Sequence, residues 1–286
     1  MTVETLSRVA EFFSSFAGSR NVAPLLLLDY DGTLAPFRVD RMKARPFKGV
    51  REILGRIQAE SQTRIVVITG RPALEISSLL RGNPPVVKEP VEVWGLHGSE
   101  RLHPDGKREV EQPTAETQRM LDQLREYLRH NNVGGEFEDK ENAAVMHWRG
   151  ASARTARFIE QRTREIFEPL AAHDGLTLLE FESGLELRAG RDKGDAVRAI
   201  VAEMPAGTPI AFLGDDYTDE AAFRAVNQSS GPHLSVLVKP EKRATDAELW
   251  LRPPSELRMF LKKWLKAAQA APSLHRAAAD LDEEAA

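Results

Sequence analysis

Four consecutive leucines, Leu25 to Leu28, lead directly into the polar segment Asp29-Tyr30-Asp31-Gly32-Thr33. A continuous apolar run of this kind is typical of a parallel strand that is covered on both faces. Two similar runs follow, at 65–68 and 209–213. The pattern therefore predicts three buried strands. The two later runs also end in polar groups, namely Thr69-Gly70-Arg71 and Gly214-Asp215-Asp216.

The segments around these runs have the spacing of helices. Residues 3–18 place their apolar side chains on one helical face, and Pro46 is expected to open a helix with an apolar stripe over 50–57. Strands that alternate with helices predict a parallel sheet in an α/β fold. The other predicted elements of this sheet are a strand at 91–94, a helix from Lys193 and a last strand at 234–238.

The pattern changes between 104 and 189, where the predicted order is helix, two strands, helix, two strands. This αββαββ order is typical of a small α+β layer. We therefore predict a Rossmann-like parallel-sheet core that is interrupted by an α+β cap domain, with hinges near 98–103 and 189–191 and a ligand site in the crevice between the two parts. The predicted boundaries are 1–103 and 190–266 for the core, 104–189 for the cap and 267–286 for a flexible tail.

Composition limits the possible partners. The 286 residues include 39 basic and 43 acidic side chains, a formal charge of −4, so there is no global basic field to attract nucleic acid or anionic lipid. The absence of cysteine excludes disulfides, thiolate zinc sites and cysteine nucleophiles, and is compatible with the cytoplasm. No signal peptide and no membrane span are predicted. We expect a small-molecule partner and favour a monomer.

The three predicted strands bring several polar side chains to one place. The carboxyl ends of parallel strands meet at one edge of a sheet, which is where α/β folds place their ligands. Taken singly, each polar group has an ordinary structural interpretation, such as a helix cap, a solvated lysine or an acidic loop. Together they predict one site, in which bare carboxylates need a cation. Its members are Asp29, Asp31, Thr69, Lys193, Asp215 and Asp216.

Through these residues, in this order, the chain resembles the haloacid dehalogenase superfamily of phosphotransferases. Within it, the chain looks like the trehalose-6-phosphate phosphatases, which carry an αββαββ cap where this insert lies. The further motifs that carry this likeness are Thr69-Gly70-Arg71, Gly95-Leu96-His97-Gly98, Lys193-Gly194 and Gly214-Asp215-Asp216-Tyr217-Thr218-Asp219-Glu220.

The resemblance implies a mechanism. Asp29 would attack phosphorus to form an aspartyl-phosphate, which water then hydrolyses, and Asp31 would serve as general acid and base. Thr69 and Lys193 would stabilise the phosphoryl group. The resemblance also implies Mg²⁺ as cofactor. Its expected ligands are Asp29, the backbone carbonyl of Asp31 and Asp215, with Asp216 and Asp219 in support.

Substrate choice is expected from the cap, because the core reads only phosphate. By motif position the resemblance assigns glucose hydroxyls to Glu138, Lys140 and Glu186, although a charged, solvated hairpin is an alternative interpretation. Family members often carry a basic residue shortly before that last Glu, where this chain has Glu182 and Ser183. On the core side, the expected substrate contacts are Gly70, Arg71 and His97.

Several functions are compatible with these motifs. The first is hydrolysis of trehalose 6-phosphate, and the second is hydrolysis of another sugar phosphate, of the glucosylglycerol, glycerate or sucrose phosphate type. A signalling receiver also combines acidic residues with a Thr and a Lys, but receivers are compact and lack a large insert. A catalytically idle sugar-phosphate sensor would be expected to lack one of the motif residues.

Overall fold

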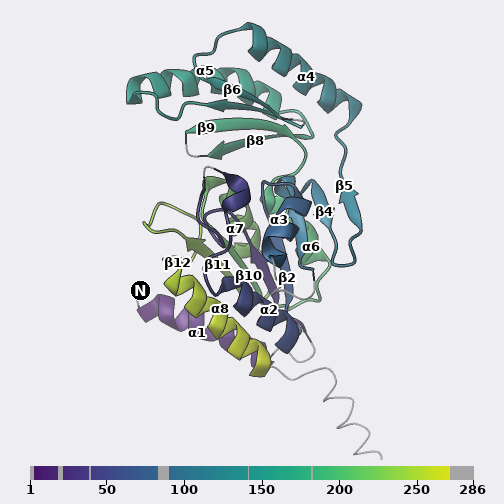
Figure 1. The fold of residues 1–286 in the computed structure, drawn as a ribbon, viewed down its shortest axis with the longest axis vertical. Helices are drawn as coiled ribbons and strands as arrows, with labels where there is room; N and C mark the ends of the chain where they lie inside the picture. Colours follow the sequence, from purple (N-terminus) through teal and green to yellow (C-terminus); the bar gives the residue numbers. More distant parts are fainter. Residues whose placement is uncertain are drawn as a thin grey trace, which may run out of the picture.

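The computed structural model describes residues 3–18, 22–38, 40–82, 90–140, 142–181 and 183–270. Its main sheet has eight strands in the order β12-β11-β10-β1-β2-β3-β4-β5, parallel from β12 to β3 and antiparallel at β4 and β5. The predicted α/β class with a Rossmann-like core is confirmed (Figure 1). The strands are β1 (Leu25–Leu28), β2 (Arg64–Ile68), β3 (Glu92–Gly95), β4 (Glu100–Leu102), β5 (Arg108–Val110), β10 (Ile210–Gly214), β11 (His233–Val238) and β12 (Leu249–Leu251).

Helices cover both faces of this sheet. One face packs against α1 (Val3–Gly18), α2 (Val50–Glu60), α3 (Ala73–Arg81) and α8 (Ser255–Ala270). The other face packs against α6 (Lys193–Ala202) and α7 (Glu220–Asn227). Short 3₁₀ turns are η1 (Arg41–Lys43), η2 (Leu96–Gly98) and η3 (Tyr217–Asp219). In the described part of the chain, no helix combines the length and apolarity needed to cross a bilayer.

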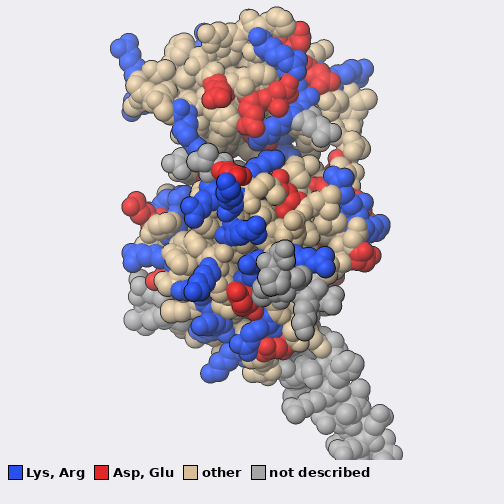
Figure 2. All heavy atoms as spheres, in the orientation of Figure 1, with Lys and Arg blue, Asp and Glu red and all other residues tan. Residues whose placement is uncertain are grey.

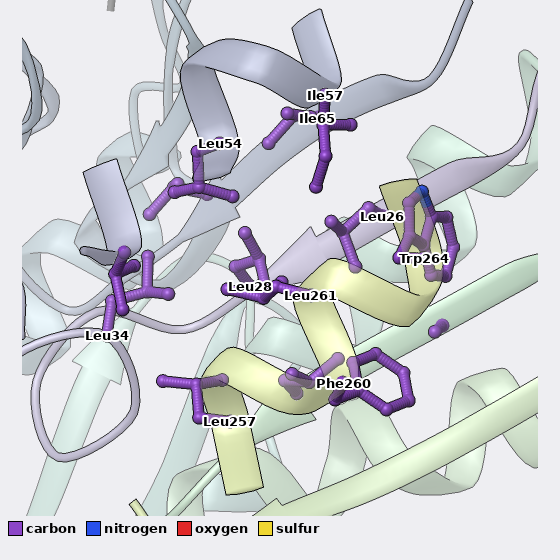
Figure 3. Close-up of a cluster of buried hydrophobic side chains, with 14 of the residues drawn as sticks. Leu26, Leu28, Leu34, Leu54, Ile57, Ile65, Leu257, Phe260, Leu261 and Trp264 are labelled. Carbon is purple, nitrogen blue, oxygen red and sulfur yellow. The ribbon is translucent and has the colours of Figure 1, made fainter. Parts of the chain in front are cut away.

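The four leucines of β1 alternate between the two layers. Leu26 and Leu28 join the cluster on the α8 side, whereas Leu25 and Leu27 join the cluster on the α6 side, and all four are 0% exposed. Figure 3 shows Leu26 and Leu28 beside the side chains of α8, including Trp264. Burial of each such leucine contributes roughly 1.5–3 kcal/mol. Burial on both faces therefore fixes the position of β1, and with it the position of Asp29, the next residue along the chain.

A second, antiparallel sheet with the order β6-β7-β9-β8 forms a separate body above the first (Figure 1). Helices α4 and α5 cover one of its faces, where Leu121, Met146 and Leu185 belong to its core. The other face points toward the main sheet (Figure 1). The αββαββ order matches the expectation for the cap. Its elements are α4 (Ala115–His130), β6 (Glu136–Lys140), β7 (Ala143–His147), α5 (Ala153–Ala171), β8 (Leu176–Phe181) and β9 (Gly184–Ala189).

Several predicted boundaries differ from the structure. The expected end of the first core segment, residue 103, falls inside the main sheet, because β5 pairs with β4. The chain therefore leaves the core at 111–114 and not at the expected hinge, 98–103. The strand at 234–238 is not the last, since β12 follows it.

Two helix predictions also need correction. Helix α2 begins at Val50 and not near Pro46, because Gly49 precedes it in the left-handed conformation with φ 89°. Helix α8 is absent from the predicted elements; it runs to Ala270 and so includes the start of the expected flexible tail at 267. The remainder of that expected tail, 271–286, lies outside the described residues.

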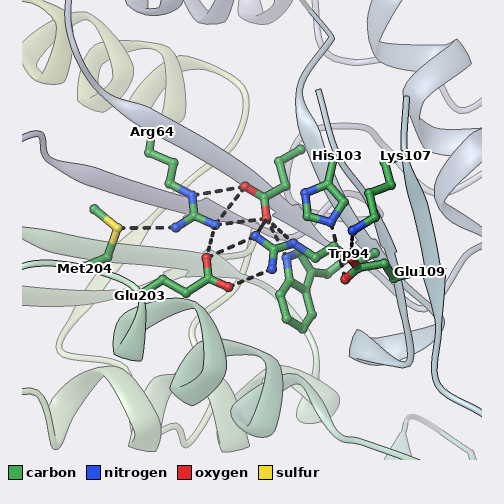
Figure 4. A network of polar contacts seen from close by, with 9 residues as sticks. Arg64, Trp94, His103, Lys107, Glu109, Glu203 and Met204 are labelled. Carbon is green, nitrogen blue, oxygen red and sulfur yellow. Dashed lines mark hydrogen bonds and ion pairs between the residues drawn. The ribbon is translucent and has the colours of Figure 1, made fainter. Parts of the chain in front are cut away.

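A polar network joins four elements at the amino-terminal ends of β2 and β3 (Figure 4). The buried Glu92 accepts hydrogen bonds from Arg64 Nε at 3.0 Å, Arg101 Nε at 2.9 Å and Trp94 Nε1 at 2.9 Å. Both arginines also donate to Glu203, each at 2.7 Å. The network ties β2, β3 and β4 to the end of α6, the helix that begins with Lys193.

Candidate active site

The three strands with polar ends are direct neighbours in the main sheet, in the order β10-β1-β2. Their parallel pairing places Leu28 beside Leu213 and Val67, so the residues that follow them meet at one edge. Asp29 and Asp215 are buried, with 4% and 3% exposure. Thr69, directly after β2, is also buried. The structure thus brings together the residues that the sequence pattern placed at this edge.

Lys193 joins this group from α6. Its Nζ atom donates to Asp29 Oδ1 at 2.7 Å and to Asp219 Oδ1 at 2.6 Å. A capping box between the N-cap residue Asp192 and Asp195 stabilises the start of α6, so Lys193 is fixed as the first residue of the helix. A buried ammonium group between two carboxylates is thereby held in one position.

Asp219 organises the acidic loop. Its Oδ2 atom accepts hydrogen bonds from the backbone N–H groups of Asp215 at 2.9 Å and Asp216 at 3.0 Å. Among the described residues, Asp29, Asp215 and Asp219 form a group of three carboxylates whose oxygen atoms lie within 4.8 Å of one another and could hold a metal ion. The Asp216 side chain instead accepts from the backbone of Tyr217 at 2.8 Å. The resemblance implies only a supporting place for Asp219.

Charge at this edge is unbalanced, because three buried carboxylates face one lysine. Burial raises the pKa of Asp29 to about 7, and the neighbouring Asp219 adds to this, although Lys193 opposes it. Burial likewise raises the pKa of Asp215 well above its usual value, and the charge of Asp29 adds to it. Burial lowers the pKa of Lys193, but Asp219 and Asp29 outweigh it and raise the pKa. An excess of buried carboxylate oxygens fits a hard divalent cation such as Mg²⁺.

Two glycines allow the close contacts of the site. Gly32 has φ +83°, and a Cβ atom there would overlap the carboxylate of Asp215. A Cβ atom on Gly70 would lie 2.6 Å from His97 Nε2. Both positions therefore need glycine, the first for its conformation and both for the space.

Asp31 lies on the same loop, but its carboxylate points to Arg71. Arg71 Nε donates to Asp31 Oδ2 at 2.6 Å, and Arg71 Nη2 donates to Asp31 Oδ1, so the pair is a two-pronged fork. Arg71 also donates to Glu75 at 3.0 Å through Nη1. Its backbone N–H donates to Thr69 Oγ1 at 3.2 Å. Arg71 thus links the loops after β1 and β2.

The cap presents its predicted residues on one face because of the strand register. Glu138 pairs with Val145, which pairs with Glu186, so the two glutamates share a row across the sheet. Lys140 lies one pleat further along β6. Its Nζ atom donates to Glu186 Oε2 at 2.8 Å. Glu138 accepts instead from His147 Nε2 at 2.9 Å, with the tautomer that donates from this nitrogen.

A cavity of about 270 Å³ lies between the core loops and this face of the cap. Figure 2 shows both acidic and basic side chains along the seam between the two bodies. Glu138 is not among the lining residues, and Glu182 lies outside the described part of the chain. The cavity is lined by the predicted Asp29, Asp31, Thr69, Gly70, Arg71, His97, Lys140, Glu186, Lys193, Asp215 and Asp216, and also by Phe37, His147, Arg149, Leu179, Phe181 and Thr218.

Among the residues of this region that the sequence did not predict, Phe37 and Arg243 have the clearest placement. Phe37 is 65% exposed at the cavity, and only its place shortly after the Asp29 loop could have pointed to it. Arg243 lies in the loop after β11 and donates to the backbone carbonyls of Asp215 at 3.3 Å and Asp216 at 2.8 Å. Nothing in the local sequence around Arg243 signals this contact, because the two segments meet only in the folded chain.

The paired aspartates after one strand, the threonine after its neighbour, and the lysine and acidic loop beside them are the residues that carry the resemblance to the haloacid dehalogenase superfamily. A haloacid dehalogenase-like hydrolase from B. subtilis shares this fold, with a TM-score of 0.59 and 15% identity over 84% of this chain and 99% of that one. The chain belongs to the trehalose-phosphatase family, since residues 27–255 match that family's sequence pattern. The predicted class of phosphoric monoester hydrolase is thereby confirmed.

Individual relatives agree with this membership. The trehalose-6-phosphate phosphatase of Escherichia coli is 29% identical over 213 residues, which are 73% of this chain and 75% of that protein. A bifunctional trehalose-6-phosphate synthase/phosphatase of Thermoproteus tenax is 30% identical over 265 residues, 88% of this chain but only 34% of the relative. The trehalose-6-phosphate phosphatase of Aspergillus fumigatus shares the fold, with a TM-score of 0.66 and 23% identity over 90% of this chain and 97% of that one.

Proposed function

We propose that this chain hydrolyses trehalose 6-phosphate to trehalose and inorganic phosphate. The observation that carries the proposal is that one cavity is lined both by the buried pair Asp29 and Lys193 and by the cap residues Lys140 and Glu186. The first pair supplies a nucleophile with a fixed cation beside it. The second pair offers a hydrogen-bond donor and an acceptor to sugar hydroxyls. Membership of the trehalose-phosphatase family supports the choice of sugar.

Asp29 is the proposed nucleophile. Lys193 donates to its Oδ1 atom, and we assign the attack on phosphorus to the other oxygen, Oδ2. A bond forms between Oδ2 and phosphorus, the bond from phosphorus to the sugar oxygen breaks, and that oxygen takes a proton and leaves as trehalose. Water then attacks the aspartyl-phosphate, which releases phosphate and restores Asp29. The reaction is divided into two displacements, each easier than the direct one.

Asp31 is the proposed source of the first proton and acceptor of the second. Both carboxylate oxygens of Asp31 accept hydrogen bonds from Arg71, so the fork holds this carboxylate against the guanidinium. The pair between Asp31 and Arg71 would therefore open before the Asp31 carboxyl turns to the leaving oxygen. A phosphate group near Thr69 would compete for Arg71, which lines the same cavity. Substrate binding itself would then free Asp31.

Mg²⁺ is the proposed cofactor. The side chains of Asp29 and Asp215 and the backbone carbonyl of Asp31 would hold it, with Asp216 in support. When bound, it neutralises negative charge so that a carboxylate can approach a phosphate dianion. Both carboxylate oxygens of Asp219 are already engaged, one by Lys193 and one by two backbone N–H groups. We therefore assign to Asp219 the task of positioning Lys193 and the acidic loop.

Phosphate release from a panel of purified sugar phosphates tests this function. The panel contains trehalose 6-phosphate, glucose 6-phosphate, and the sucrose, glucosylglycerol and glycerate phosphates, each with Mg²⁺ or with EDTA. We expect trehalose 6-phosphate to exceed the others in kcat/KM by at least about tenfold, and only with Mg²⁺. Preference for another member would replace the substrate and keep the chemistry. No release from any of them would favour a sensor, and Asp29→Asn serves as the inactive control.

A further inference from the structure

Arg188 is a buried cation at the seam between the cap and the core. It lies on β9, two residues after Glu186, and is 4% exposed. Burial lowers its pKa, although Glu186 and Asp192 oppose this. A guanidinium is rarely buried to this extent unless it is paired or hydrogen-bonded, because removal of its hydration shell costs free energy.

The contacts of Arg188 join the two bodies. Its Nη2 atom donates to the backbone carbonyl of Leu96 in η2 of the core at 2.7 Å. Its Nη1 atom lies 3.4 Å from Oε1 of Glu186 in the cap. One side chain thus contacts both a residue proposed to bind the sugar and a turn of the core.

The turn that Arg188 contacts is under strain. Leu96 and His97 have φ values of 49° and 57°, in the left-handed region that side chains other than glycine rarely adopt. Such backbone persists only where its surroundings hold it. The Leu96 N–H donates to Arg71 O at 3.0 Å and the His97 N–H donates to Thr69 O at 2.8 Å. These bonds fasten the turn to the loop that carries Thr69, and Arg188 adds a third tie from the cap.

Glu186 is held from both sides. Lys140 donates to its Oε2 atom at 2.8 Å, and Arg188 lies beside its Oε1 atom. If a sugar changes the hydrogen bonds of Glu186, the contact between Glu186 and Arg188 therefore changes as well. Through Leu96 the same guanidinium reaches the loop that places Thr69.

We propose that Arg188 is a positioning residue that couples sugar binding at Glu186 to the placement of the Thr69 loop, through the strained Leu96–His97 turn. The inference rests on the proposed function. It predicts that loss of Arg188 harms the turnover of a substrate whose sugar reaches the cap. A phosphate ester without hydroxyl groups cannot use this route, because it offers Glu186 no hydrogen bond.

The test compares Arg188→Met with Arg188→Lys on two substrates, trehalose 6-phosphate and p-nitrophenyl phosphate, both with Mg²⁺. For trehalose 6-phosphate we expect kcat to fall roughly tenfold in Arg188→Met. Arg188→Lys keeps the charge but not the fork and should lie between it and the unchanged protein. Hydrolysis of p-nitrophenyl phosphate should stay within about twofold in both variants. Arg157→Met, an exposed substitution on α5, is the matched control and should change neither rate.

A double-mutant cycle with Glu186→Gln completes the test. If Arg188 acts through Glu186, adding Arg188→Met to the Glu186→Gln variant should change little. On trehalose 6-phosphate, kcat of the double variant should lie within about twofold of kcat of Glu186→Gln alone. Fully additive losses would overturn the proposal. Two further results would overturn it in Arg188 variants whose urea midpoint is unchanged. One is an equal fall in kcat on both substrates, and the other is no fall in kcat on trehalose 6-phosphate. If Arg188→Met does not fold, Arg188→Lys decides by the same comparison. Lack of trehalose 6-phosphate hydrolysis in the unsubstituted chain is a separate result, which would contradict the proposed function itself.

Discussion

The Nζ atom of Lys193 lies 2.7 Å from Oδ1 of Asp29, and neither side chain is more than 5% exposed. Two opposite charges that are buried this deeply depend on each other, because each would otherwise be left without solvent or partner. The relationship is set by the fold, since Asp29 follows β1 and Lys193 starts α6 on the far side of the cap insertion.

Lys193→Met should abolish measurable phosphatase activity and, in EDTA, lower the free energy of unfolding by about 3 kcal/mol, because it leaves buried carboxylates uncompensated. Urea unfolding and phosphate release measure the two effects. The exposed Lys266 of α8 offers a matched Lys→Met control, with an expected change within about 0.5 kcal/mol. A Lys193→Met variant with ordinary turnover would remove Lys193 from the mechanism.

The raised pKa of Asp29 predicts how stability depends on pH. In the folded chain this pKa is about 7, mainly because of burial, against 3.8 for an ordinary aspartate. Between these values the folded state binds a proton that the unfolded state releases, so the free energy of unfolding should fall as pH rises. Asp29 contributes at most about 1.4 kcal/mol per pH unit to this fall.

This dependence is measured by urea unfolding in EDTA from about pH 4 to about pH 7, with Asp29→Asn as reference. As pH rises, the free energy of unfolding of the unsubstituted chain should fall relative to that of Asp29→Asn. Addition of Mg²⁺ should reverse the trend, because its ligands must be deprotonated. Stabilisation by Mg²⁺ that does not grow with pH would contradict the assignment of Asp29 and Asp215 as ligands.

Arg243 stabilises the acidic loop by donating hydrogen bonds to the backbone carbonyl groups of Asp215 and Asp216. Arg243→Ala should raise the Mg²⁺ concentration for half-maximal activity by roughly tenfold or more, as the loss of other supporting contacts around metals does. Activity at saturating Mg²⁺ should largely return. A titration of activity with Mg²⁺ distinguishes this outcome from a loss of kcat that no amount of Mg²⁺ restores.

Glu138 and Glu186 form a matched pair in the cap. They share a row of the sheet, but Glu186 lines the cavity whereas Glu138 is bonded to His147 and does not line it. Glu186→Gln should therefore raise KM for trehalose 6-phosphate by about tenfold, and Glu138→Gln by less than about threefold. Equal effects would mean that the cap closes further on its substrate and brings Glu138 into contact with it.

The network around Glu92 should contribute to stability but not to chemistry. Glu92→Leu leaves Arg64 and Arg101 without their buried partner, so we expect a loss of about 3 kcal/mol in urea unfolding. Since Glu203 still accepts from both arginines, the protein should fold and keep its KM for substrate. A large rise in KM would contradict this prediction and would mean that the network, through α6, also positions residues of the site.

The strongly patterned parts of the chain could be predicted from the sequence. The leucines of β1 indicated a strand buried on both faces, and the polar residues after three such strands indicated one shared edge, because parallel strands end together. Strand β12 has three residues and could not be recognised by periodicity. Helix α8 has a clear apolar stripe that joins the main core, so its periodicity was sufficient to predict it.

The finer details of the site depended on contacts between distant segments. The resemblance implies a supporting place for both Asp216 and Asp219, but the backbone turns the Asp216 carboxylate to Tyr217 and places Asp219 beside Asp29 and Asp215. The fork between Arg71 and Asp31, 40 residues apart, likewise has no local signal. The domain boundary at 103 was wrong because β4 and β5 extend the main sheet as a hairpin before the chain enters the cap.

The most direct test of the account is the location of the phosphoryl group during turnover. The protein is mixed with trehalose 6-phosphate and Mg²⁺, quenched in acid within one turnover, digested and analysed by mass spectrometry. We predict an acid-stable, hydroxylamine-labile phosphate on the peptide that contains Asp29, and none in Asp29→Asn. Phosphate on a different residue, or full turnover by Asp29→Asn, would contradict the account.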